Sequence, residues 1–78
     1  LKGKHPLVVA NILPDPLCAM AKALSQAVAP GGSLILAGLR IGEKPRLVST
    51  FAAHGLILSD HQAIKEWMGL TLRRPKSA

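Results

Sequence analysis

Hydrophobic residues in this sequence occur in two patterns that alternate along the chain. Residues 6–12 form a continuous apolar run rich in β-branched side chains, which predicts a strand buried on both faces of a sheet. Residues 15–29 instead show helical spacing, and we expect Asp15 to cap this helix and the Pro-Gly-Gly of residues 30–32 to end it. Its expected inward face comprises Leu17, Met20, Ala21, Leu24 and Val28.

The same alternation continues through the second half of the chain. Residues 33–39 are a second continuous apolar strand, and residues 45–54 are expected to be a helix that ends at Gly55. The side chains expected to face inward from this helix are Leu47, Val48, Phe51 and Ala52. Residues 56–64 and 66–74 are two more strands, too close in sequence for a crossover helix, and should pair as an antiparallel hairpin.

The element order is therefore strand, helix, strand, helix, strand, strand. This order predicts an α/β fold that is the C-terminal half of a Rossmann-like sheet, with parallel strands first and an antiparallel hairpin last. The first strand is apolar enough to be central, yet nothing in the sequence would flank it on its other side, and the chain opens on Leu1 rather than Met. We therefore expect residues 1–78 to be a single partial domain that lacks its N-terminal part.

Composition restricts the setting and the partners. The 78 residues carry ten Lys and Arg against four acids, which suits either an anionic partner such as RNA or a solubilising surface. A stacking platform for single-stranded nucleic acid is not expected, because Phe51 and Trp67 are the only aromatic residues. One cysteine, no signal peptide and no long apolar segment predict a cytoplasmic protein without a membrane span.

Asn11 is the first candidate site residue. It follows a buried strand and precedes a turn stiffened by two prolines. In open parallel sheets, ligands bind beyond the carboxyl ends of the strands. There an amide oxygen and nearby backbone carbonyls would accept hydrogen bonds from an amine. The alternative at this point is that Asn11 only caps a turn or the start of the helix.

Three segments carry a family resemblance. "VVANILPDPL" (8–17), "VAPGGSLILAGL" (28–39) and "EWMGLTLRRP" (66–75) resemble the C-terminal half of bacterial ribosomal-protein methyltransferases of the PrmA type, in the same order. The resemblance implies that the full-length protein uses S-adenosylmethionine to methylate amino groups on a ribosomal protein of the large subunit. It implies that Asn11 lies between cofactor and target amine, orienting the amine with backbone carbonyls of residues 12–13, and that Trp67 lies near the active site. The alternative for Trp67 is a packing residue beneath the edge of the sheet.

The sequence also departs from the family pattern. Lys65 stands where a glycine is usual, and Pro14 stiffens the loop after Asn11. The glycine-rich turn and the acidic residue that hold the cofactor in this fold have no counterpart here, so we expect the isolated chain to bind cofactor poorly and to be inactive. His54, His61 and Asp60 match no zinc spacing, and no metal is expected.

Two other functions stay open at this point. One is a small basic module that binds ribosomes or RNA without catalysis. The other is the distal half of a nucleotide-dependent oxidoreductase, which shares the alternation of strands and helices.

Overall fold

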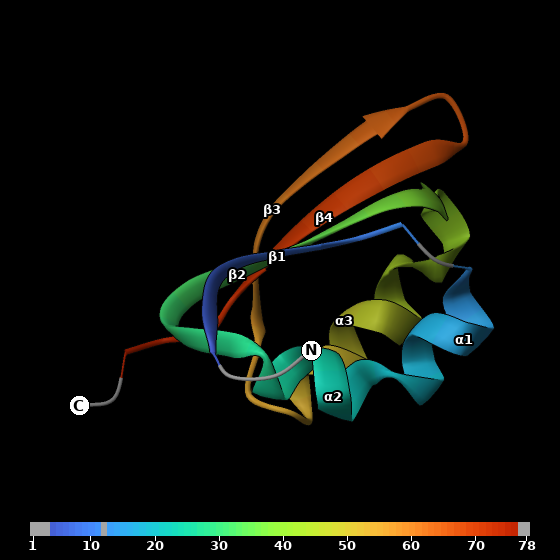
Figure 1. Cartoon of the computed structure of the whole chain (residues 1–78). Coiled ribbons are helices and arrows are strands. Elements are labelled where there is room, and N and C mark those ends of the chain that lie inside the picture. The colour runs from blue at the N-terminus through green and yellow to red at the C-terminus, as the bar shows by residue number, and fades with distance from the viewer. Residues whose placement is uncertain (1–3, 12, 77–78) are drawn as a thin grey trace.

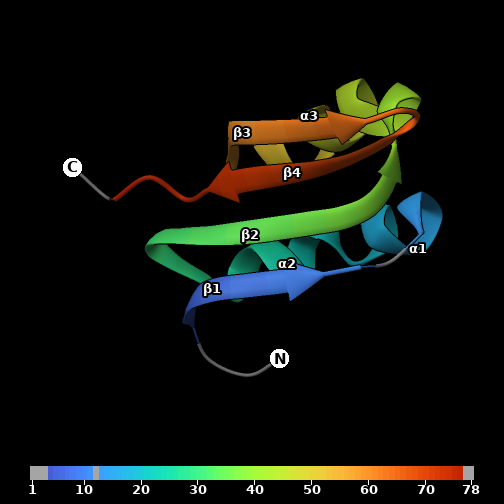
Figure 2. The same cartoon turned by 90° about the horizontal axis from the view of Figure 1, so that it is seen from above.

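The computed structural model of this chain describes residues 4–11 and 13–76, and its four strands form one sheet in the order β1-β2-β4-β3. β1 (His5–Ala10) lies at one edge and runs parallel to β2 (Val28–Arg40). β4 (Trp67–Arg73) pairs antiparallel with both β2 and the other edge strand, β3 (Ile57–Ile64). Figure 2 shows this order across the sheet. The expected parallel pair and terminal antiparallel hairpin are both confirmed.

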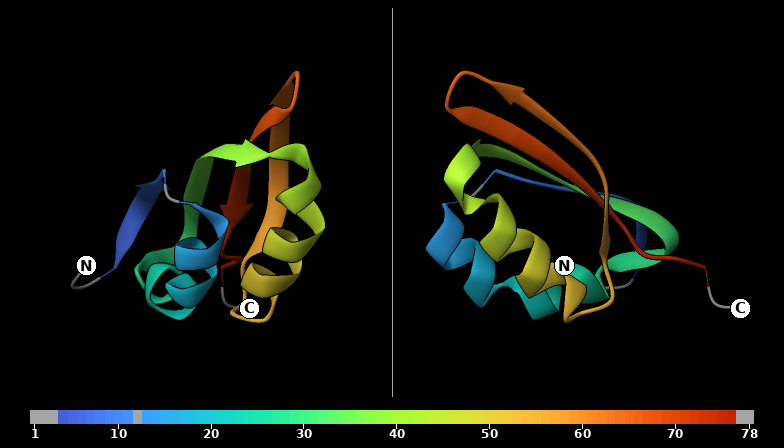
Figure 3. Two further views of the ribbon diagram at one scale, coloured as in Figure 1. Left: turned by 90° about the vertical axis from the view of Figure 1, so that its right-hand side faces the viewer. Right: turned by 180° about the vertical axis from the view of Figure 1, so that it is seen from behind.

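The helices cover one face of the sheet. They are α1 (Pro14–Ala19), α2 (Ala21–Gln26), the short 3₁₀ turn η1 (Ile41–Glu43) and α3 (Lys44–Ala52). All of them lie on the same side in Figures 1 and 3. The core between the two layers includes Leu17 from α1, Phe51 from α3 and Leu34 from β2, each of which is no more than 1% exposed. Among the described residues, no helix is long and apolar enough to span a bilayer.

The helix expected over residues 15–29 is wrong in extent. The structure has two shorter helices that meet at Met20, and β2 already begins at Val28. Backbone pairing explains the difference, because Val28 pairs with His5 of β1 and Gly32 accepts a hydrogen bond from the Arg74 amide. These sheet contacts draw the Pro-Gly-Gly segment into a strand. Val28 is accordingly buried in β2 rather than on a helix.

Three expected burials and one expected cap are also wrong. Met20 is 42% exposed and Ala52 is exposed, although both were expected to face inward. β1 is buried on one face only: Val8 lies against the helices, whereas Val9 on the other face is 62% exposed. The helices cover a single face, so β1 alternates instead of being buried on both sides. Asp15 does not cap α1, which begins one residue earlier without a side-chain cap.

Candidate functional site at the carboxyl ends of the parallel strands

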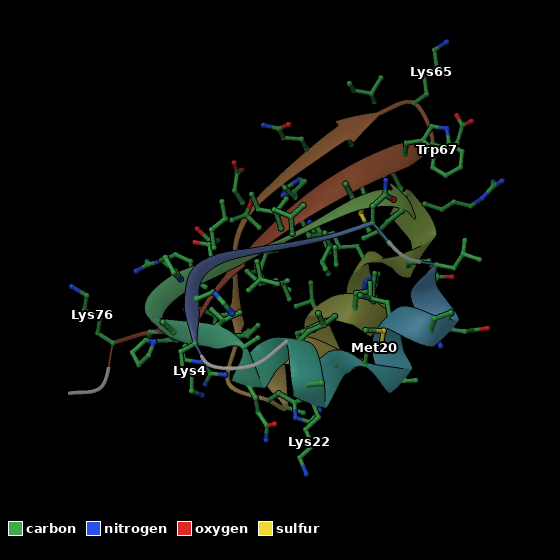
Figure 4. All side chains as sticks on the ribbon, viewed as in Figure 1. Lys4, Met20, Lys22, Lys65, Trp67 and Lys76 are labelled. Atoms are coloured by element: carbon green, nitrogen blue, oxygen red, sulfur yellow. The ribbon has the colours of Figure 1, made fainter. Side chains whose placement is uncertain are left out.

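The fold gathers the candidate residues at one end of the sheet. β1 and β2 are parallel, so their carboxyl ends lie at the same edge, and Asn11 directly follows β1. β4 runs the opposite way and begins at Trp67, which pairs with Arg40, the last residue of β2. Trp67 and the neighbouring tip of the β3–β4 hairpin stand at this end in Figure 4. This is the end at which open α/β sheets bind ligands.

Gly38 provides the space for the Asn11 side chain. A Cβ atom built on Gly38 would lie 2.5 Å from Asn11 Oδ1, and Gly38 has a φ of +73°. Both observations call for glycine, because other residues rarely adopt this backbone conformation and any side chain would collide with the amide. The pairing of β2 with β4 shifts register between Leu36 and Leu39, around this glycine. Gly38 therefore forms a seat for the amide within a bulge of β2.

Asn11 does not serve as a helix cap. α1 starts after Leu13, and no side chain caps it. The Asn11 side chain is exposed, and it makes no hydrogen bond to any residue in 4–11 or 13–76. Its amide oxygen therefore has lone pairs to offer an external donor. Residue 12, expected to contribute a backbone carbonyl, lies outside the described residues, and Leu13 is exposed.

A mainly apolar pocket adjoins the Gly38 seat on the open face of the sheet. The pocket has a volume of about 230 Å³ and is lined by Ala37, Gly38, Gln62, Ile64, Trp67, Met68 and Gly69. Gly38 thus contacts the Asn11 amide and also forms part of the pocket that Trp67 lines. The Trp67 side chain is 45% exposed, so it does not pack beneath the sheet. Gly38 therefore adjoins both the Asn11 amide and the pocket that Trp67 lines.

Trp67 already holds a cation on its ring. The guanidinium carbon of Arg40 lies 5.2 Å from the centroid of the indole. This distance is within the range of a cation–π interaction, which contributes about 0.5–1 kcal/mol at an exposed site. Arg40 was not a candidate in the sequence, because its place beside Trp67 depends on the register of β2 against β4.

The first turn of α1 is tied to α3 by one arginine. Arg46 Nη2 donates to Asp15 Oδ1 over 2.7 Å, and Arg46 Nη1 lies 3.4 Å from Glu43 Oε2. The hydrogen bond with Asp15 is the main cause of a raised pKa for the Arg46 guanidinium. A second pocket of about 250 Å³ lies here, lined by Leu13, Asp15, Pro16 and Glu43. The acid expected to cap α1 therefore anchors the start of that helix to α3 instead.

The chemical character of the site is that of a neutral acceptor beside an apolar wall. Within the described ranges, no three His, Cys, Asp or Glu side chains gather in a way that would hold a metal. Asn11 and the Trp67 pocket offer a hydrogen-bond acceptor and an apolar surface to a ligand that carries N–H groups. They offer nothing for the ribose of S-adenosylmethionine, for which this fold class uses an acidic side chain.

Comparison with known proteins identifies the family. The family described as ribosomal protein L11 methyltransferase (PrmA) matches residues 1–75. The chain belongs to this family. Ribosomal protein L11 methyltransferases of Bradyrhizobium diazoefficiens and Chromohalobacter salexigens are 38% and 33% identical to it over 72 residues, 92% of this chain in each case. The chain spans 24% of the length of each of these two relatives.

Solved structures confirm a partial Rossmann-like methyltransferase fold. A ribosomal protein L11 methylase from Lactobacillus delbrueckii subsp. bulgaricus superposes with a TM-score of 0.86 at 25% identity, covering 96% of this chain and 39% of the other. The M1.HpyAVI–SAM complex superposes with a TM-score of 0.77 at 9% identity, covering 94% of this chain and 46% of that one, which shows a shared fold alone.

Asn11 and Trp67 stay site residues predicted from the sequence, whereas Gly38 and Arg40, which the structure places beside them, were not predicted. Gly38 had a usable signal, since an isolated glycine inside an apolar strand often marks a bulge or a close approach. No local feature of the sequence marks Arg40 as a site residue, because arginines are common at the ends of strands.

Proposed function

We propose that the full-length protein containing these residues uses S-adenosylmethionine to methylate amino groups on a ribosomal protein of the large subunit. Membership of the L11 methyltransferase family supports the reaction class and the substrate. The observation that carries the assignment of the site is the Asn11 amide, seated on Gly38 beside the Trp67 pocket at the carboxyl ends of the parallel strands.

Asn11 acts on the amine rather than on its proton. An amide oxygen is too weak a base to deprotonate a lysine, whose ordinary pKa is about 10.4, so the amine loses its proton to solvent before it reacts. Asn11 Oδ1 then accepts a hydrogen bond from one N–H of the amine. This hydrogen bond orients the amine so that its lone pair points toward the methyl group. When bound, S-adenosylmethionine would supply a methyl group on a sulfonium sulfur, which is a leaving group that takes the C–S electron pair with it. In such a displacement, alignment supplies most of the rate enhancement.

The Trp67 pocket suits the apolar part of such a substrate. Its walls exclude water from the methylene groups of a lysine, and Gln62 supplies the polar side chain among its lining residues. We propose that Asn11 and Trp67 are the residues of this chain at the reacting amine, and that Asn11 also adjoins the cofactor. Residues 1–78 then form a single partial domain, the amine-side wall of a site completed by residues outside this chain.

A ribosomal substrate implies a cytoplasmic reaction, a setting in which the half-buried thiol of Cys18 stays reduced. RNA binding has less support than methylation. Of the lysines labelled in Figure 4, Lys65 projects at the top and Lys22 at the bottom of the view, while Lys4 and Lys76 lie at the left, so the four do not gather in one patch. A weak RNA contact through the basic surface therefore stays a prediction from the sequence.

The proposal is tested by Asn11→Ala in the full-length protein. Because one misaligned contact costs about 100-fold in such reactions, we expect kcat to fall about 100-fold while the urea midpoint stays unchanged. Gln26→Ala is the matched control, since it removes an exposed amide at the far end of the α2 helix. Wild-type turnover in the Asn11 variant would overturn the site assignment, and no methyl transfer by the wild-type protein to any ribosomal protein would overturn the function.

A further inference from the structure

Arg40 is held in a defined position against Trp67. The two residues are direct partners in the β2–β4 register, and the amide of Ile41 donates to the carbonyl oxygen of Glu66 over 2.9 Å. These backbone contacts fix the two strand ends to each other, so the 5.2 Å between guanidinium and ring follows from the sheet itself. Trp67 lines the apolar pocket and Arg40 is not one of its lining residues, so the guanidinium adjoins the pocket through its contact with the indole.

The charges of neighbouring elements do not cancel that of Arg40. Glu43 in η1 and Asp15 in α1 are both paired with Arg46. Lys65 and Glu66, in the turn that precedes Trp67, carry opposite charges and are exposed. Asp15 and Glu43 share the single charge of Arg46 and so keep one net negative charge, which Lys44, at the start of α3, balances. The charges of these six side chains sum to zero, so the positive charge of Arg40 is left uncancelled beside the indole.

We propose that Arg40 tunes the reaction by keeping the bound target amine in its neutral, nucleophilic form. The inference rests on the proposed function, because it places the amine beside Asn11 and Trp67. A protonated lysine has no lone pair with which to attack. A unit charge about 7 Å away, in an effective dielectric of about 40, lowers the pKa of an amine by about one unit. Arg40 thus raises the neutral fraction about tenfold at neutral pH.

The same charge has an opposite effect once proton loss is complete. As nitrogen attacks the methyl carbon, it gains partial positive charge while the C–S bond breaks and its electron pair moves onto sulfur. Arg40 repels that developing charge, so it slows the displacement step itself. Its benefit is confined to pH values below the pKa of the bound amine. Because of these two effects, the pH–rate profiles of the wild type and of a variant without the Arg40 charge should converge or cross at high pH. A merely structural role of Arg40 would not produce this.

The test is the pH dependence of kcat in the full-length protein at saturating ribosomal-protein substrate. With Arg40→Gln the rising limb should move up by about one pH unit, lowering kcat about five- to tenfold at pH 7, whereas the plateau at high pH should equal or exceed that of wild type. Arg40→Lys should keep most of the wild-type limb. The limb of kcat/KM should not move, because it reports the free amine.

Arg73→Gln is the matched control. It removes the same exposed charge from the far end of β4, about 20 Å from Trp67, and should leave the profile unchanged. A uniform loss of kcat at every pH in the Arg40→Gln variant, or an unshifted limb, would overturn the proposal. If the wild-type protein methylates its substrate and only the Arg40→Gln profile fails to shift, the role of Arg40 is refuted and the proposed function still holds. A wild-type protein without methyl transfer would instead refute the proposed function.

A binding measurement gives the same answer without turnover. A peptide with ¹³C-labelled dimethyl-lysine, bound together with S-adenosylhomocysteine, reports its own protonation through the methyl chemical shift. We expect the pKa of the bound amine to be lower than that of the free peptide in the wild-type protein, and to rise by about one unit with Arg40→Gln. Equal values of the bound pKa in wild type and variant would refute the inference.

Discussion

Replacing Gly38 by alanine tests how the fold aims Asn11. The new Cβ would lie 2.5 Å from Asn11 Oδ1, and distances under 3.0 Å are essentially never seen for real Cβ atoms. The amide oxygen must therefore move by at least about 0.5 Å, and it can do so because it is the end of an exposed, rotatable side chain. We expect the Asn11 amide to turn away from its seat.

Two separate magnitudes follow from this geometry. The backbone at φ +73° costs alanine about 1–2 kcal/mol of stability relative to glycine. The collision with Asn11 adds little to this loss of stability, because the Asn11 side chain rotates away. For activity the collision matters more than the backbone strain, because it displaces Asn11. A displacement of about 1 Å in a positioning group lowers the rate about 100-fold, so we expect kcat of Gly38→Ala to fall about 10- to 100-fold.

Gly55→Ala separates these two effects. Gly55 has a φ of +88°, and its added Cβ would meet only the end of the Arg74 side chain, at 3.2 Å. The two variants of the full-length protein should lose similar stability in urea denaturation, whereas only Gly38→Ala should lose methyl transfer. Full activity in Gly38→Ala, or an equal loss of activity in both variants, would refute the reasoning.

Two further predictions concern the rest of the chain. Arg74→Gln should lower the free energy of unfolding by about 1.5–3 kcal/mol in urea denaturation, because Arg74 Nε donates to the Val28 carbonyl over 2.9 Å and Nη2 donates to that of Ser25; Arg73→Gln, the exposed neighbour, should cost less than about 0.5 kcal/mol, and equal losses would contradict this account. Titration calorimetry of the 78-residue chain with S-adenosylhomocysteine should show no micromolar binding, since the sequence has no glycine-rich strand–turn–helix; micromolar affinity would contradict an incomplete cofactor site.

The parallel pair β1–β2 and the β3–β4 hairpin were predictable because each rests on a local signal, whereas the pairing of β2 with β4 was not predicted. Continuous apolar runs predicted β1 and β2, and the short connection at residue 65 predicted the β3–β4 hairpin. The break at Met20 and the early start of β2 were not predictable, because pairing of Val28 with His5 overrides local helical spacing. The exposure of Val9 was equally beyond the sequence, because it depends on what covers the second face of the sheet.

The candidate site was predictable only in part. Asn11 could be found from its place after an apolar strand, and Trp67 came from the family resemblance. The contact of Arg40 with Trp67 depends on the register between strands distant in sequence, and a one-residue slip in that register would turn the side chain to the other face.

The register shift at Gly38 connects the seat of Asn11 with the placement of Arg40. Leu34 and Leu36 are buried against the helices, and strict alternation would put residues 38 and 40 on that same face. Instead the shift between Leu36 and Leu39 buries Leu39 and turns Arg40 to the open face, where it meets Trp67. One glycine bulge therefore makes room for the amide and also directs the guanidinium. A Gly38→Ala substitution that straightens β2 should therefore also move the rising limb of kcat against pH upward, as Arg40→Gln does. Asn11→Ala should instead lower kcat without moving that limb.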